Sequence, residues 1–156
     1  MSYYKHGMTP RGVYNSTYFT WAQMKQRCTN PKHDRYANYG GRGISYDPRW
    51  EDYQEFYADM GERPQNLTLG RLENDKDYYK DNCSWQTYEV QSFIRSVRAD
   101  NSSGMTGVSW KSANKKWMAR VTIRGIEYVL YYGKSFEEAC LARQEWNDAF
   151  TEALRA

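Results

Sequence analysis

Residues 117–124 alternate between apolar side chains and side chains that are mostly basic or polar. The apolar positions are Trp117, Ala119, Val121 and Ile123, and the positions between them are Met118, Arg120, Thr122 and Arg124. Because successive side chains of a strand point to opposite faces, this period of two predicts a half-buried β-strand with one apolar and one basic face. Such a strand has to lie in a sheet that is covered on one side only.

The residues around this strand predict its partners. Residues 107–111 and 127–132 have strand character, and Arg124-Gly125 forms a plausible tight turn between two strands. Ser135 and Glu138 have the spacing of a capping box, in which each side chain bonds a backbone N–H of the other. The helix that follows carries apolar residues at helical spacing, namely Phe136, Ala139, Cys140, Trp146, Phe150 and Leu154. The sequence therefore predicts a small antiparallel sheet packed on one helix.

The uncovered face of this sheet is predicted to be basic. Its cationic and polar residues are Arg120, Thr122, Arg124, Lys111, Lys115 and Lys116, and Glu127 is the one nearby acid. A sheet of this size can enter the major groove of DNA, where Arg reads guanine edges and Lys holds phosphates. The alternative is an ordinary solvated surface.

The first part of the chain predicts helices over 18–28 and 50–60, and a hairpin that runs into a helix from residue 69 onward. Residues 39–44 hold three glycines around Arg42, which would let the backbone approach a phosphate. The segment lacks the lysine and the spacing of a nucleotide-binding loop, so a tight turn is the favoured interpretation.

Composition sets the remaining bounds. With 156 residues, the chain can form one domain or two small ones, and its net charge of +3 does not identify a partner. We expect a first domain over 1–98, a polar linker over 99–104 and a second domain over 105–156.

Three well-separated cysteines and no long apolar run predict a reduced, cytoplasmic protein that does not enter a membrane. Cys28 and Cys83 could bind zinc with His6 or His33, although buried thiols fit the spacing better.

The second domain, over about 103–150, resembles the DNA-binding domain of plant ethylene-response factors. The matching segments are Thr106 to Trp110, Lys116 to Val121 and Tyr132 to Ala139. The resemblance implies contacts with double-stranded DNA in the major groove. Two of the positions are not basic where the plant domains often have Arg, which implies a different base specificity. The implied contact residues are Ser109, Lys111, Arg120, Thr122 and Tyr128.

The first domain, over about 6–96, resembles a phage family of HNH-type, homing-like endonucleases. The matching residues are Tyr18, Trp21, Met24, Lys25, Arg27, Cys28, Asn30 and Pro31, then Tyr36 and Tyr39 to Ile44, then Asp59 to Gly61, Arg63 and Pro64, then Arg71, Leu72, Asn74, Asp75, Tyr78, Asn82, Cys83 and Trp85. The resemblance implies an α+β fold with a ββα-metal domain and flanking helices.

HNH chemistry uses a hairpin and a helix that hold one divalent metal, here Mg²⁺ or Mn²⁺, while a base activates water. The phage family carries Asp-Arg at the hairpin, but this chain has Gly70 and Arg71. The resemblance makes Asn82 the residue that pins the loop and Gln91 the helix ligand. Glu73 and Asp75 are the nearest carboxylates for a displaced metal, and His6 is a candidate base from elsewhere.

Three functions follow from these resemblances and from the aromatic content of the chain, which has 15 Tyr, 6 Trp and 5 Phe. The first is a metal-dependent DNA endonuclease or nickase, with Arg71, Glu73, Asp75, Asn82 and Gln91 as its site. The second is a catalytically inactive DNA-binding protein that grips phosphate through Arg71. The third is a phage protein whose aromatic-rich surface binds a host or phage protein. In each case the expected location is the cytoplasm of the infected bacterial host.

Overall fold

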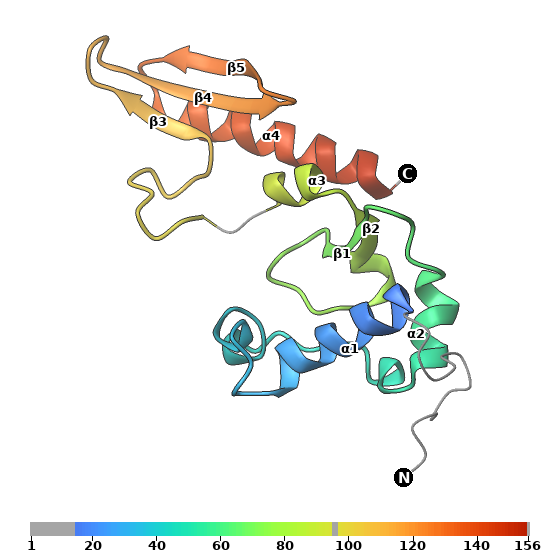
Figure 1. Cartoon of the computed structure of the whole chain (residues 1–156). Coiled ribbons are helices and arrows are strands. Elements are labelled where there is room, and N and C mark those ends of the chain that lie inside the picture. The colour runs from blue at the N-terminus through green and yellow to red at the C-terminus, as the bar shows by residue number, and fades with distance from the viewer. Residues whose placement is uncertain (1–14, 95–96, 156) are drawn as a thin grey trace. The chain divides into compact units, whose positions relative to one another are not determined.

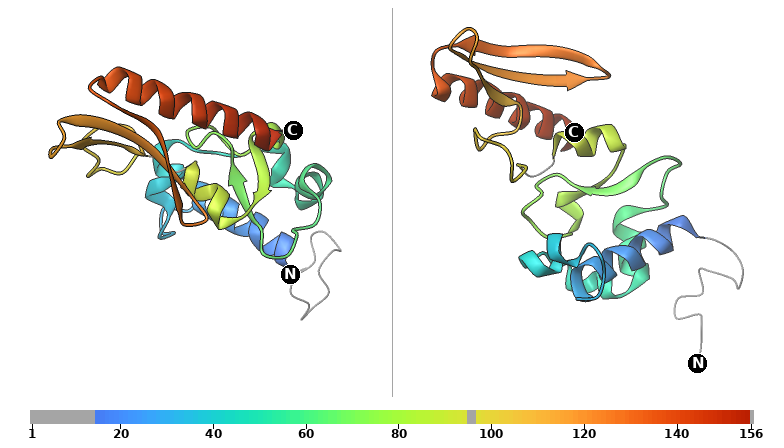
Figure 2. Two further views of the ribbon diagram at one scale, coloured as in Figure 1. Left: turned by 90° about the horizontal axis from the view of Figure 1, so that it is seen from above. Right: turned by 60° about the vertical axis from the view of Figure 1, so that its left-hand side comes forward.

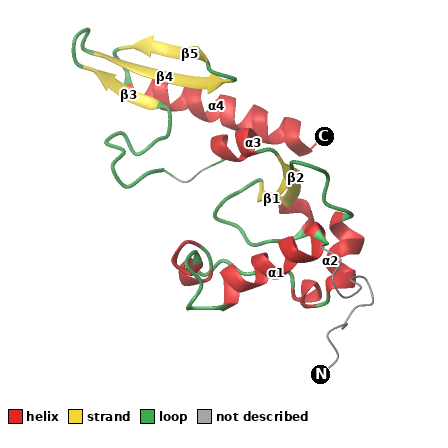
Figure 3. Ribbon diagram, in the orientation of Figure 1, coloured by secondary structure: helices red, strands yellow, loops and turns green. Residues whose placement is uncertain are grey.

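The computed structural model describes residues 15–94 and 97–155, and its fold is mixed α+β. The chain divides into two compact units, Met1–Ile94 (unit 1) and Arg95–Ala156 (unit 2). The helices and strands of each unit can be followed in Figures 1 and 3. Within the described ranges, none of the helices combines the length and the apolar character that a membrane span requires.

Unit 1 consists of helices around one antiparallel strand pair. Its labelled elements are α1 (Ser16–Thr29), α2 (Tyr53–Met60), β1 (Thr68–Arg71), β2 (Cys83–Gln86) and α3 (Tyr88–Phe93). Short 3-10 helices at Tyr36–Asn38, Gly40–Arg42, Pro48–Glu51 and Lys80–Asn82 connect them. The predicted order of a hairpin followed by a helix is therefore present as β1, β2 and α3.

The helix predicted over 50–60 is wrong in its first turn. Pro48–Glu51 form a 3-10 helix, and α2 begins only at Tyr53. Asp52 between them is extended, and its carboxylate accepts a hydrogen bond of 2.8 Å from the backbone N–H of Gln54. This cap starts a new helix, because it satisfies an N–H group that has no partner within the helix.

The core of unit 1 is aromatic. Trp50, Tyr53 and Phe56 are fully buried, and the indole N–H of Trp21 donates to the carbonyl of Trp50 at 2.7 Å. Gly40 lies against this core, since a Cβ there would stand 2.0 Å from the carbonyl oxygen of Cys28 on α1. Close packing on a helix thus explains Gly40, whereas Gly43 is explained by its positive φ of 86°.

Unit 2 is a three-stranded antiparallel sheet with one helix along it. Its elements are β3 (Val108–Lys111), β4 (Lys116–Ile123), β5 (Ile126–Gly133) and α4 (Phe136–Arg155), and the strand order is β3-β4-β5. Figure 2 shows α4 running along one face of the sheet. Arg124 and Gly125 both have positive φ, at 50° and 80°, which confirms the predicted tight turn.

A β-bulge in β5 changes which residues face α4. Ala119 pairs with Tyr131 but Arg120 pairs with Val129, so Leu130 is an extra residue without a partner on β4. Both Leu130 and Tyr131 consequently pack against the core beneath α4. Simple alternation along β5 does not hold beyond this point.

The start of α4 differs in part from the predicted capping box. The Ser135 hydroxyl accepts from the N–H of Glu138 at 3.1 Å, as expected. The Glu138 carboxylate, however, accepts from the Tyr131 hydroxyl at 2.6 Å, and that hydroxyl also accepts from the N–H of Ser135 at 3.1 Å. Tyr131 therefore takes the reciprocal position that the sequence pattern assigned to Glu138.

Arg143 is a buried cation in the helix–sheet interface. Its side chain is 3% exposed, donates to the carbonyl of Arg120 at 2.7 Å, and lies 4.9 Å from the ring centroid of Trp146. Burial lowers the pKa of this guanidinium. Arg143 thus ties α4 to β4 at Arg120, opposite the bulge of β5, at a position where the apolar stripe predicts no charge.

Polar residues of the predicted linker belong to unit 2. The Ser103 hydroxyl donates to the carbonyl of Val108 at 2.7 Å, and the Asn101 amide donates to the carbonyl of Met105 at 3.2 Å. These bonds hold the segment before β3 in an ordered turn.

Candidate nucleic-acid interface and hairpin site

Asn82 pins the loop between β1 and β2. Its side chain is 1% exposed and its oxygen accepts from the N–H of Glu73 at 2.9 Å. Its amide nitrogen donates to the carbonyls of Glu73 at 3.2 Å and Asp77 at 2.9 Å. The loop-holding geometry expected for this residue is therefore present.

Arg71 is built into the same loop. Its guanidinium donates to the carbonyl of Lys76 at 2.8 Å and to the side-chain oxygen of Asn74 at 3.1 Å. It also lies 4.8 Å from the ring centroid of Tyr78 and 5.2 Å from that of Tyr39. Arg71 is only 7% exposed, so its guanidinium stabilises the loop and is not accessible to a phosphate from solvent.

The space in front of Gly70 is filled by Gln86. A Cβ on Gly70 would lie 2.1 Å from the side-chain oxygen of Gln86, which is 3% exposed. The amide nitrogen of Gln86 donates to Ser84 at 2.9 Å, and its oxygen has no hydrogen-bond partner within the described residues. Gln86 thus occupies the position into which a carboxylate at residue 70 would project.

The other predicted ligands do not converge. Glu73 pairs with Lys76 at 2.8 Å, and Asp75 pairs with Arg42, all in exposed or half-exposed positions beyond the end of β1. Gln91 on α3 donates to the hydroxyl of Thr68 at the opposite end of β1. Residues 15–94 and 97–155 bring no three His, Cys, Asp or Glu side chains into a group that could hold a metal ion. Glu73, Asp75 and Gln91, as the structure describes them, therefore do not form the ligand set that a divalent ion prefers.

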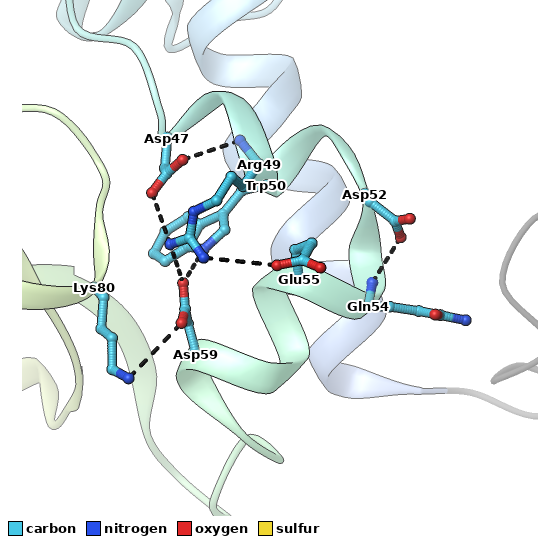
Figure 4. Close-up of polar contacts among 8 residues, drawn as sticks. All are labelled: Asp47, Arg49, Trp50, Asp52, Gln54, Glu55, Asp59 and Lys80. Atoms are coloured by element: carbon cyan, nitrogen blue, oxygen red, sulfur yellow. Dashed lines mark hydrogen bonds and ion pairs between the residues drawn. The ribbon is translucent and has the colours of Figure 1, made fainter.

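Asp47 and Asp59 form a little-exposed acidic cluster that basic side chains neutralise (Figure 4). Asp59 accepts from the indole N–H of Trp50 and from the guanidinium of Arg49, each at 2.8 Å, and Lys80 lies 3.8 Å away. Arg49 also reaches Asp47, whose pKa is lowered by hydrogen bonds from the backbone N–H and the guanidinium of Arg49. These contacts join α2 to the segments that precede it and to the hairpin loop.

The cysteines have no partner for zinc among the described residues. Cys28 and Cys83 are buried free thiols, and burial raises their pKa values to about 11 and about 12. His33 contacts Asp34 at 3.0 Å and Gln23 at 3.4 Å. His6, the other proposed ligand and the candidate base, lies outside the described residues.

In unit 2, strand register defines the face that α4 leaves uncovered, here called the outer face. Residues directly opposite each other in a sheet share a face. Ser109 pairs with Met118, Lys111 with Lys116, Arg120 with Val129 and Thr122 with Glu127. The outer face therefore carries Ser109, Lys111, Lys116, Met118, Arg120, Thr122, Glu127, Val129 and Tyr132.

Two of the implied DNA contacts are not presented as expected. Tyr128 pairs with Val121, which is buried, so Tyr128 lies on the other face from Arg120 and Thr122. The Ser109 hydroxyl is covered and has no hydrogen-bond partner within the described residues. The implied interface keeps Lys111, Arg120 and Thr122 as its accessible members.

Positive charge on the outer face gathers at the end where β3 meets β4. Arg120 is paired with Glu127 on the neighbouring strand. In the described part of the chain, by contrast, Lys111, Lys115 and Lys116 form no ion pair with a carboxylate. Arg124 lies in the β4–β5 turn, at the far end of β4. We call Lys111, Lys115 and Lys116 the lysine end.

A groove of about 590 Å³ opens beside the lysine end. It is lined by Trp110, Lys111, Ser112, Ala113, Asn114, Met118, Val129 and Tyr132. Its apolar members, which include Trp110, Met118, Val129 and Tyr132, were not predicted as site residues. Val129 and Tyr132 lie together on the outer face because of the bulge at Leu130. A bulge interrupts the alternation of a strand, so no sequence pattern predicts it.

Comparisons with models of protein families, with curated proteins and with solved structures found no match to this chain. A functional proposal therefore rests on the geometry of the two units.

Proposed function

We propose that the protein binds double-stranded DNA through the outer face of unit 2. The observation that carries this proposal is the lysine end, where three cations without a carboxylate partner in the described chain border an uncovered sheet face. Ammonium groups in such a position contact phosphates and give most of the sequence-independent affinity for DNA. The resemblance to the ethylene-response-factor domain supports the same surface.

Arg120 is the candidate base-reading residue. Its pairing with Glu127 is between two exposed side chains, and such pairs contribute only about 0–1 kcal/mol. The guanidinium of Arg120 can therefore leave Glu127 and bind the edge of a guanine at little cost in free energy. The hydroxyl of Thr122, on the same face, can donate to or accept from a base edge. Arg120 sets specificity in this proposal, and the lysine end sets affinity.

Unit 1 is proposed to be a structural relative of HNH nucleases that has lost the metal-dependent reaction. The pinned loop and the β1, β2, α3 order support the relationship. Gly70, the Gln86 side chain in front of it, and the internal bonds of Arg71 support the loss. The alternative is a working endonuclease, which the same hairpin and helix would favour if a metal were bound elsewhere in the chain.

We expect supercoiled plasmid to be shifted but not nicked by the protein. Gel analysis after incubation with Mg²⁺ or Mn²⁺ and with EDTA should show the same shift in each, because phosphate contacts by lysine need no metal. Metal-dependent nicking that disappears in Glu73→Ala/Gln91→Ala would instead establish an endonuclease. Absence of any shift would reject DNA binding and favour a protein partner.

A further inference from the structure

We propose that the groove beside the lysine end binds one unpaired nucleobase of a DNA strand. This inference rests on the proposed function, because the same outer face would contact DNA. It goes further because it names an unpaired base as the feature of DNA that the protein prefers over a regular duplex. The occupant is an extrahelical or single-stranded base whose phosphate lies on the lysine end.

The first support is the apolar and aromatic lining. Met118 is buried at the base of the outer face, and Val129 and Tyr132 beside it are 55% and 42% exposed. Exposed apolar side chains that gather around a concavity mark a binding surface more often than a solvated one. A volume of about 590 Å³ also lies within the range of small-ligand sites.

The bulge explains why these side chains point outward. Without the extra residue Leu130, residues 129 and 132 of β5 could not face the same side of the sheet. The bulge thus places Val129 and Tyr132 on the outer face while Leu130 and Tyr131 both pack inward. Bulges are frequent beside functional sites because they redirect single side chains.

Charge at the rim supports a nucleotide over an uncharged aromatic ligand. Lys111 and Lys116 stand directly opposite each other across β3 and β4, an arrangement of like charges that destabilises a strand pair. The ammonium of Lys116 lies 4.9 Å from the ring centroid of Tyr132, so the cation and the ring border the groove together. A phosphate bound between the lysines would remove their repulsion.

An unpaired base fits this surface better than a stacked one. In a duplex the faces of each base are covered by its neighbours, and only its edges are accessible. Aromatic side chains beside a basic groove bind single strands by stacking on the exposed face of a base. Asn114 donates to the Tyr132 hydroxyl, which holds the ring in place at the groove.

Fluorescence anisotropy with three labelled DNAs tests the inference on the full chain. The DNAs are a duplex, the same duplex with one unpaired thymine, and its single strand. We expect the bulged duplex to bind about tenfold more tightly than the regular one, because stacking of one base on an aromatic ring contributes about that factor to the affinity. Equal affinities for the regular and bulged duplexes would overturn the inference and leave the proposed function intact. No binding to any of the three would overturn both.

Two tyrosines of β5 provide a matched pair of variants. Tyr132→Ala should abolish the tenfold preference, and Tyr132→Phe should retain it because the ring remains. Tyr128→Ala removes a similarly exposed ring from the opposite face and should leave the preference unchanged. Thermal melts would show that each variant is folded. A preference that survives in folded Tyr132→Ala, or that Tyr128→Ala removes equally, would contradict the assignment of the groove.

Discussion

Replacement of Asn82 by Ala is expected to lower the free energy of unfolding of unit 1 by about 3 kcal/mol or more. The variant leaves the N–H of Glu73 and the carbonyls of Glu73 and Asp77 without the bonds that the Asn82 side chain provides. Each buried polar group that loses its partner costs about 1–3 kcal/mol. Urea denaturation followed by near-ultraviolet circular dichroism measures the loss.

Two further variants separate loop pinning from a general effect of losing an amide. Asn82→Asp keeps an oxygen that can accept from Glu73 but sets a buried carboxylate oxygen against the carbonyls of Glu73 and Asp77, so we expect a loss of stability at least as large as that of Asn82→Ala. Asn38→Ala removes an exposed amide from a 3-10 helix of the same unit and should have little effect. The three backbone groups of Glu73 and Asp77 together should cost more than about 1 kcal/mol. If the free energy of unfolding of Asn82→Ala stays within about 1 kcal/mol of that of the unchanged protein, the Asn82 side chain does not hold the loop.

The second large effect is expected on DNA affinity. Lys111→Ala/Lys116→Ala should reduce the slope of log K against log salt by about 1.8, since each phosphate contact contributes about 0.9. At 0.1 M salt this corresponds to a loss of about sixtyfold in affinity. Anisotropy titrations of one duplex at several salt concentrations give both quantities.

A variant with the same net charge serves as the control for this loss. Lys32→Ala/Lys80→Ala removes two exposed cations from unit 1 and should change the slope little. If this control weakens binding as much as the variant of the lysine end, the affinity comes from overall charge or from unit 1. The outer face of unit 2 would then not be the interface.

Much of unit 2 could be predicted because its sequence signals are local. The alternation along 117–123 requires one covered face, and the turn at Arg124-Gly125 and the cap at Ser135 mark where elements change. The bulge at Leu130 could not be predicted, because one extra residue in a pairing depends on both strands. The bulge accounts for the groove that was missed, whereas the face of Tyr128 follows from the regular register after the turn, which places it opposite the buried Val121. Arg143 was missed because its partner is a backbone carbonyl on another element.

The hairpin site of unit 1 was predictable in outline only. The sequence indicates the loop-pinning Asn82 and the missing carboxylate at Gly70. The burial of Arg71 depends on Tyr39 and Tyr78, which come from distant segments, and Gln86 reaches Gly70 only through the register of β1 with β2. Residues brought together by such long-range packing leave no spacing pattern.

Backbone amide NMR of the labelled chain during titration with a DNA duplex tests the central proposal most directly. Binding through the outer face predicts that the largest shift changes occur at Lys111, Lys116, Arg120 and Thr122, with small changes at the described residues of unit 1 and at the solvent side of α4. Largest changes in the β1–β2 loop, or no changes at saturating DNA, would contradict the assignment of the outer face as the DNA-binding surface.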